Sequence, residues 1–584
     1  MPRLLPLLLL LASPHALATP PRASELFLAG GSLRTCSDLA PQACRSPRTD
    51  PARRQPARYL VDDESIARAL DPLLWRASAG APPASALAPM LASAARDADW
   101  SRDQLEDHFS AYCPRATCDG VAFGSPWQRL LDDEQAALLS ALERPQRHGK
   151  GRARERADLA DSREQAGVAI LRAFVAAAAA RADGRPPRIA VVTASAVDPF
   201  DPVDFYLDAF RELGADAVWW PVDAALEAAV SSGDCDALES LRREHLQLAG
   251  RDRIYPDLAE QQRQACLDPE TTAALPGQVQ GMFFAGGDQW RHRAAFFDAA
   301  DRPNAWLVSL RASHASGALV VGGTSAGTAV QGGAAMLSNG TSALALREGA
   351  RARAPMAPGC ARAGRCADGL DEDTLTYWDR GGLGLLPGWT MDTHFSERAR
   401  ELRLLALMHA AKVDHALGVD ETSAIRVVKQ DGALRFEALG AQGGWLFERQ
   451  PETPDGAMAA RVHYLAPGAE FSLEAAGLKP LAPLGNVVSD AAAPRGTATR
   501  QAAEANAASG NDALAPESLR AAARVAADCS RTLRPLSAGD GTATLACTDA
   551  TFAWPAPGTG PRTTRGVGNL LLRYAPGAEE ARSR

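Results

Sequence analysis

The stretch VVGGTSAGTAV, residues 320–330, places a single serine, Ser325, among glycines and other small residues directly after an apolar run. Its centre, Gly323 to Gly327, matches the pattern G-x-S-x-G, in which a sharp strand-to-helix turn pushes the serine oxygen into a cleft. Backbone N–H groups at the start of the following helix are free to stabilise negative charge there. The stretch therefore predicts a nucleophilic serine, although glycine- and serine-rich turns without chemistry are also common.

A serine nucleophile needs a base, and the base needs a group that orients it. His394, in MDTHF, follows a strand-like apolar segment, and Glu421, in GVDETSA, lies beside Asp420 just before another strand. Both occupy the ends of predicted strands, and in parallel sheets the catalytic and binding residues lie at the carboxyl ends of the strands. Taken singly, such a histidine is more often structural and such a glutamate more often solvated.

The elements that must position these side chains are apolar strands alternating with helices. This rhythm predicts an α/β fold with a doubly wound, mostly parallel sheet flanked by helices. A first strand, ELFLAGGSL, lies far upstream of the others, and a D-G turn at Asp431-Gly432 is expected between two closing strands. The strand-like runs are RIAVVTAS (188–195), AVWWPV (217–222), QGMFFAGGDQW (280–290) and the run before Ser325.

The N-terminus has the pattern of a secretory signal peptide. A positive start, an apolar run from Leu4 to Leu11 and an A-x-A site at Ala16 to Ala18 predict cleavage and export to the periplasm or the extracellular space. No later segment is apolar and long enough to cross a membrane. We expect a signal peptide over 1–18, a first core strand within 19–33, a largely helical insertion over 34–163, a catalytic domain over 164–474, and a linker with a C-terminal extension over 475–584.

Composition narrows the function classes further. The net charge of −8 over 584 residues gives no basic field that would attract nucleic acid. The ten cysteines include no C-x-x-C pair, so local disulfides in an oxidising compartment are a better interpretation than a zinc ribbon. The close pairs are Cys36/Cys44, Cys113/Cys118, Cys360/Cys366 and Cys529/Cys547, which leaves Cys235 and Cys266.

The motifs FAGGDQ, GGTSAG, DTHFSERARELRL and GVDETSA, in that order, resemble the cyanophycinase and dipeptidase E family of serine peptidases. The resemblance covers roughly 165–440 and the first strand, and it implies a class-I glutamine-amidotransferase-like fold without metal or organic cofactor. It implies that Ser325 is the nucleophile, His394 the general base and Glu421 its orienting group. It further implies oxyanion donors at Gly287, Asp288 and Ala326, and a substrate pocket of Gln289, Asp392, Thr393, Arg398, Arg400 and Arg403.

The implied substrate is cyanophycin, a poly-aspartate whose β-carboxylates carry arginine. Arginines suit its free carboxylate, and Asp392 suits its guanidinium. Thr393 departs from the family pattern, which has glutamine before the histidine, and this leaves an Asp-X dipeptidase as an alternative. At least one arginine of the trio is expected to be structural. A homodimer is left open.

Other interpretations stay open beside this one. An α/β-hydrolase esterase shares the serine motif, but there the acid precedes the histidine along the chain. A class-I amidotransferase would need cysteine at position 325. A non-catalytic binding protein of the same fold is the third alternative. Separately, the acidic string Asp198, Asp201 and Asp204 is expected to cap the following helix, with attraction of a guanidinium as the alternative.

Overall fold

The computed structural model describes residues 22–46, 53–113 apart from 77, 79 and 97, 124–481 apart from 475 and 476, 513–526, 535–555 and 565–576. The expected signal peptide, 1–18, lies outside these residues. Among the helices of the described ranges, none combines the length and the hydropathy of a membrane span.

The larger sheet has nine strands and two halves. Five parallel strands stand in the order β1-β9-β8-β6-β7, and four antiparallel strands, β20-β19-β16-β15, continue the sheet from β1. The expected turn at Asp431-Gly432 joins β15 to β16. The strands are β1 (Ser24–Ala29), β6 (Arg188–Val192), β7 (Asp216–Trp219), β8 (Gly281–Phe284), β9 (Val320–Thr324), β15 (Ser423–Gln430), β16 (Ala433–Gly440), β19 (Glu470–Glu474) and β20 (Gly477–Pro480).

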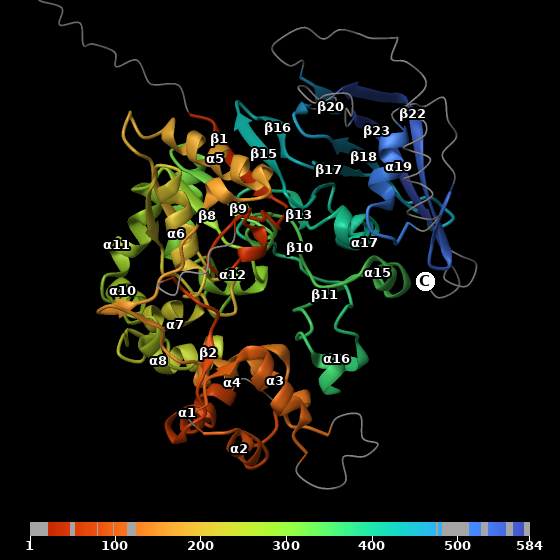
Figure 1. Ribbon diagram of the computed structural model, residues 1–584. Helices are drawn as coiled ribbons and strands as arrows, with labels where there is room; N and C mark the ends of the chain where they lie inside the picture. The colour runs from red at the N-terminus through yellow and green to blue at the C-terminus, as the bar shows by residue number, and fades with distance from the viewer. Residues whose placement is uncertain are drawn as a thin grey trace, which may run out of the picture.

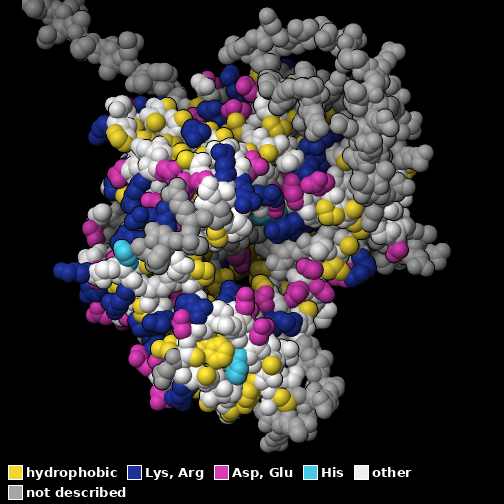
Figure 2. Space-filling model, viewed as in Figure 1, with side chains coloured by type: hydrophobic (Ala, Val, Ile, Leu, Met, Phe, Trp, Pro, Cys, Tyr) yellow, Lys and Arg dark blue, Asp and Glu magenta, His cyan; other side chains and the backbone are white. Residues whose placement is uncertain are grey.

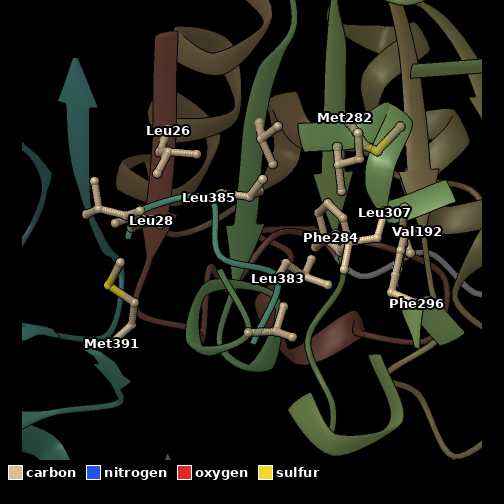
Figure 3. Packing of buried hydrophobic residues seen from close by; sticks show 14 of the residues in the cluster. Leu26, Leu28, Val192, Met282, Phe284, Phe296, Leu307, Leu383, Leu385 and Met391 are labelled. Atoms are coloured by element: carbon tan, nitrogen blue, oxygen red, sulfur yellow. The ribbon is translucent and has the colours of Figure 1, made fainter. Parts of the chain in front are cut away.

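Helices cover both faces of the parallel half (Figure 1). Side chains alternate along each strand, so Val191 and Phe283 pack towards α5 (Gln165–Ala179) and α6 (Val203–Glu212). Their neighbours Val192 and Phe284 pack on the other face (Figure 3). The helices there are α7 (Ala224–Ser232), α12 (Gln289–Phe296) and α13 (Ala305–Ala315). The mixed α/β architecture follows from apolar strands buried on both sides.

A second sheet of seven strands was not expected from the sequence. Its order is β13-β14-β17-β18-β23-β22-β21, and β13 and β14 are its parallel pair. Strands of the predicted C-terminal extension complete this sheet, while α15 (Ser342–Glu348), α17 (Glu401–Ala411) and α19 (Ser518–Ala526) pack against it. The strands are β13 (Trp389–Thr393), β14 (His415–Val419), β17 (Gly444–Arg449), β18 (Met458–Leu465), β21 (Leu536–Ala538), β22 (Gly541–Pro555) and β23 (Arg565–Ala575).

The predicted insertion forms a helical layer around its own apolar core, at the bottom of Figure 1. Its helices are α1 (Asp63–Ala69), α2 (Ala84–Ser93), α3 (Arg102–Ala111) and α4 (Asp132–Leu142). Two short ladders accompany them, β2 (Arg58–Tyr59) with β3 (Trp100–Ser101), and β4 (Arg147–His148) with β5 (Gly151–Arg152). These helices alternate with loops and short ladders, so the insertion is only partly helical in its described residues.

Acidic side chains at the carboxyl end of β6 hold the insertion. Arg54 pairs with Asp201, and Arg152 pairs with Asp204. The expected helix-capping role of this acidic string is wrong, because Pro202 occupies the N-cap of α6 and no described side chain caps it. The carboxylates instead bind guanidinium groups of the protein itself, which was the alternative.

The remaining elements connect these layers. They are α8 (Leu238–Leu241), α9 (Arg251–Ile254), α10 (Pro256–Leu267), α11 (Pro269–Ala274), α14 (Ala326–Ala329), α16 (Cys360–Ala363), β10 (Met336–Ser338), β11 (Arg351–Ala352) and β12 (Thr376–Trp378). Disulfides join Cys36 to Cys44, Cys235 to Cys266 and Cys360 to Cys366. Cys113 and Cys547 are also disulfide-bonded, while Cys118 and Cys529 lie outside the described residues.

Candidate active site

Ser325 stands in a strained turn between β9 and α14. Its φ of 53° and ψ of −118° are unusual for a residue with a side chain. The turn forms because Gly327 approaches the carbonyl of Phe284 so closely that a Cβ atom there would overlap with it. The absence of bulk around the serine therefore has a steric cause, and the turn leaves Oγ directed at the space beyond the sheet edge.

Three side chains from distant parts of the chain form one hydrogen-bonded line. The Oγ of Ser325 lies 2.8 Å from Nε2 of His394, and Nδ1 of His394 lies 2.8 Å from Oε1 of Glu421. His394 follows β13 and Glu421 follows β14, so both come from carboxyl ends of the second sheet's parallel pair. The two sheets thus direct their strand ends at one point. The side chains of His394 and Glu421 are 11% and 16% exposed.

The backbone at the end of β1 fixes all three of these positions. The carbonyl of Ala29 accepts from the N–H of Ser325, at 3.0 Å, and the carbonyl of Gly30 accepts from the N–H of His394, at 2.8 Å. The carbonyl of Gly31 accepts from the N–H of Thr422, next to Glu421, at 3.0 Å. This short segment is the common support of the site.

Gly31 also shapes the site through its own conformation. Its φ is +108°, and a Cβ atom on it would overlap with the imidazole of His394. A side chain there would push the ring away from Ser325. The sequence analysis did not assign this role to Gly31, although two glycines directly after an apolar strand are a signal for close approach of another group.

The surroundings of the line lower the pKa of both of its titratable groups, His394 and Glu421. Burial lowers the pKa of His394, and the positive charges of Arg398 and Arg400 lower it further, against the hydrogen bond to Glu421. Burial acts to raise the pKa of Glu421, but hydrogen bonds from His394, Ser32 and Arg34 bring it below the ordinary value. At neutral pH the imidazole is therefore uncharged and the carboxylate is ionised.

Two of the three expected oxyanion donors are available. The N–H groups of Gly287 and Ala326 have no acceptor among the described residues, and Gly286 packs against the Cβ of Ser325. The expectation for Asp288 needs correction, because its N–H donates to the carbonyl of Ser195 at 2.8 Å. The carboxylate of Asp288 accepts a hydrogen bond from the N–H of Trp290 and so caps the N-terminus of α12.

The expected substrate residues are of two kinds: one is exposed without a side-chain partner among the described residues, and the others already form hydrogen bonds within the protein. Arg398 is exposed, and within the described part of the chain its guanidinium makes no hydrogen bond or ion pair. Arg400 donates to the carbonyl of Thr393 at 2.6 Å. Gln289 is half-buried and donates to the carbonyl of Leu337 at 2.7 Å. Arg398 is thus the arginine of the trio that is free to receive an anion.

Asp392 and Arg403 form a buried pair. Nε and Nη2 of Arg403 donate to the two carboxylate oxygens of Asp392 at 2.9 and 2.6 Å, and Nη1 donates to the carbonyls of Asn339 and Gly340. Both side chains are nearly inaccessible. The expected substrate contacts of these two residues find no support here: the carboxylate already binds a guanidinium of the protein, and Arg403 is the structural arginine of the trio.

An arginine outside the expected set also borders the site. Nη2 of Arg34 lies 3.4 Å from Oε2 of Glu421, and its side chain is 62% exposed. On the face shown in Figure 2, the molecule is hollowed near its centre, and both basic and acidic side chains lie around the hollow. At the exposed edge of the line, the guanidinium groups of Arg34 and Arg398 favour an anionic ligand.

Metal ligands are not gathered at this site. A group of metal-ligand side chains within the described ranges consists of Cys36, Cys44 and Asp161. The two sulfur atoms are joined in a disulfide, so they are not thiolate ligands.

Comparisons with known proteins find distant sequence similarity to cyanophycinases over part of the chain. No protein-family model matches the chain. Cyanophycinases of Synechococcus elongatus and Thermosynechococcus vestitus are each 28% identical to it over 174 residues, which is 30% of this chain and 44% of theirs. The chain thus matches less than half the length of these relatives. A solved peptidase from an acI-B1 Actinobacterium aligns with 54% of this chain and 91% of its own at 14% identity and a TM-score of 0.29. The distant similarity to cyanophycinases supports a peptidase.

Proposed function

We propose that the chain is a serine peptidase that hydrolyses amide bonds in aspartyl peptides through an acyl-enzyme. The observation that carries the proposal is the hydrogen-bonded line from Ser325 through His394 to Glu421, ending beside two unpaired N–H groups. A nucleophile, a base, an orienting carboxylate and oxyanion donors in this arrangement are what acyl transfer requires.

In the proposed reaction, Ser325 Oγ attacks the carbonyl carbon while Nε2 of His394 takes the hydroxyl proton. Glu421, hydrogen-bonded to Nδ1, stabilises the imidazolium that forms. The N–H groups of Gly287 and Ala326 donate to the oxyanion. The imidazolium then protonates the leaving amine, and a water molecule, deprotonated by the same imidazole, releases the acid product and restores the serine.

The proposed substrate carries a free carboxylate near the scissile bond. The exposed guanidinium of Arg398 and the nearby Arg34 support this, since arginine recognises carboxylates with paired N–H donors. The similarity to cyanophycinases favours cyanophycin itself, cut to β-Asp-Arg dipeptides. Because Asp392 is paired internally, recognition of the substrate arginine must come from other groups.

Hydrolysis assays with three substrate types test this function. Purified protein is incubated separately with insoluble cyanophycin, with a panel of Asp-X dipeptides and with a simple ester. Release of β-Asp-Arg supports cyanophycin cleavage, release from the dipeptides alone supports the dipeptidase alternative, and cleavage of esters alone supports the esterase alternative. The variant Ser325→Ala is expected to lose at least about 10⁴-fold in kcat while its circular dichroism is unchanged. Activity retained by this variant would refute the assignment.

We also propose that the protein is exported. The leader-like residues 1–18 and the disulfides support this, because disulfides persist in oxidising compartments. Expression in a bacterial host followed by fractionation gives the test. Mature protein in the periplasm or the medium, with an N-terminus after Ala18, is expected; full-length protein in the cytoplasm would contradict export.

A further inference from the structure

We propose that helix α19 of the C-terminal extension holds the catalytic loops in register through Arg520, which makes Arg520 a positioning residue for His394 and Glu421. This inference rests on the proposed function for its kinetic consequence, but its structural consequence is independent of any substrate.

Arg520 lies buried between the two loops. Its Nη1 donates to Oε1 of Glu397 at 2.6 Å and to Oδ2 of Asp420 at 2.8 Å, and Nη2 pairs with Glu517 at 2.6 Å. Its side chain is 3% exposed, and that of Asp420 is 0% exposed. One guanidinium therefore bridges a carboxylate from the loop after His394 and a carboxylate from the loop before Glu421.

The two carboxylates in turn hold the backbone of the opposite loop. Asp420, which precedes Glu421, accepts from the N–H of Ser396 at 3.0 Å, in the 3₁₀ turn Ser396–Arg398 that follows His394. Glu397, in that turn, accepts from the N–H of Glu421 at 3.0 Å. Each loop thus accepts a backbone hydrogen bond from the other, and Arg520 neutralises the charge of both accepting carboxylates.

The arrangement depends on the positive charge between the carboxylates. Burial raises the pKa of Asp420, Arg520 lowers it, and Glu397 raises it. Glu401 is also buried close by, and burial raises its pKa to about 8. Without the guanidinium, the carboxylates of Asp420 and Glu397 repel each other in a buried region. This repulsion is removed either when one of the two carboxylates is protonated or when the two loops move apart. Either response weakens the bonds to Ser396 and Glu421.

The helix is anchored independently of Arg520. Leu519 and Ala523 are buried in the cluster that also holds Phe395, and the N–H of Glu517 donates to the carbonyl of Ser396 at 2.7 Å. One turn further, Arg524 donates to the hydroxyl of Tyr464 at 2.9 Å and to Oε1 of Gln442 at 3.4 Å, and among the described residues its side chain has no hydrogen bond or ion pair with either loop. Arg524 therefore offers a matched control on the same helix.

The test compares Arg520→Met, Arg520→Lys and Arg524→Met in the full chain. Two measurements are made: steady-state kinetics on the substrate that the wild type cleaves, and hydrogen exchange at the amides of Ser396 and Glu421. For Arg520→Met we expect kcat to fall about 10- to 100-fold with KM changed less than threefold, because a shift of about 1 Å misplaces the base. Exchange at both amides should accelerate at least tenfold. Lysine, which cannot bridge both carboxylates in the same way, should give an intermediate result, and Arg524→Met should match wild type.

The outcomes separate this inference from the proposed function. If the Ser325→Ala variant keeps its activity, the proposed function is refuted. The hydrogen-exchange rates of Ser396 and Glu421 in Arg520→Met still decide the inference in that case. Wild-type kcat and wild-type exchange in Arg520→Met overturn the inference alone. Where Arg520→Met does not fold, Arg520→Lys decides: slower turnover with faster exchange at the two amides supports the role, and wild-type values for both overturn it.

Discussion

Replacement of Glu421 by glutamine is the most direct perturbation of the proposed mechanism. The change keeps the size of the side chain and removes its charge from a position 2.8 Å from Nδ1 of His394. In the transition state the imidazole carries a positive charge, and a carboxylate with its charge centre about 4 Å away contributes about 4 kcal/mol at an effective dielectric constant of 20. A neutral hydrogen bond contributes about 1 kcal/mol.

The difference of about 3 kcal/mol corresponds to a fall in kcat of about 10²-fold, at 1.36 kcal/mol per factor of ten. The amide can also donate to Nδ1, which places the ring proton on Nε2, facing Ser325, where it blocks proton transfer. We therefore expect kcat of Glu421→Gln to fall by about 10²- to 10³-fold.

The same variant should move the pH profile. The hydrogen bond to Glu421 raises the pKa of His394, so its loss lowers that pKa. Since the base must be uncharged, activity is lost as the pH falls through this pKa, and the acid limb of kcat/KM should move to lower pH. Arg34→Gln, which removes an exposed charge beside the other carboxylate oxygen, is a control for kcat alone: kcat should change less than about threefold, while KM rises because Arg34 belongs to the proposed carboxylate site. A Glu421→Gln variant within threefold of wild-type kcat would refute the role of the carboxylate.

Three further perturbations test separate parts of the site. Arg398→Gln removes a charge that lowers the pKa of His394, so the acid limb should move to higher pH and KM for a carboxylate-bearing substrate should rise; unchanged profiles would exclude this role. Gly31→Ala forces a methyl group against the imidazole, and kcat should fall at least about tenfold in a folded protein, measured by kinetics with circular dichroism. Arg403→Met removes both guanidinium hydrogen bonds of the buried Asp392 and leaves it the longer ion pair with Arg400 at 3.5 Å, so the free energy of unfolding in urea should fall by about 3 kcal/mol; a raised KM at unchanged stability would contradict the structural role.

The candidate residues of the line could be picked out from the sequence because each follows an apolar strand-like run, and the carboxyl ends of parallel strands collect functional residues. The sequence did not show that these strands belong to two different sheets whose ends face each other. Ser325, His394 and Glu421 all follow such runs, and the structure brings them within hydrogen-bond distance. The family resemblance adds to this placement, because four ordered motifs are more specific than any single one.

Other features depend on pairings that no local pattern encodes. A buried arginine and a substrate-binding arginine look alike in the sequence, and the partner that distinguishes Arg403 from Arg398 is an aspartate on another element. The availability of the Asp288 N–H depends on the carbonyl of Ser195, on a different strand end. The role of Arg520 depends on carboxylates about 100 residues upstream. Such roles follow from the packing of distant elements and emerge only with the fold.

The position of β1 has a consequence for synthesis. This strand pairs with β9 on one side and with β15 on the other, so its partners leave the ribosome roughly 300 and 400 residues after it. During that interval both edges of an apolar strand are unpaired, and unpaired strand edges favour association with other chains. The hydroxyl, the imidazole and the carboxylate cannot assemble on Ala29–Gly31 until the chain has been synthesised at least as far as Thr422. A shorter nascent chain therefore cannot form the hydrogen-bonded line.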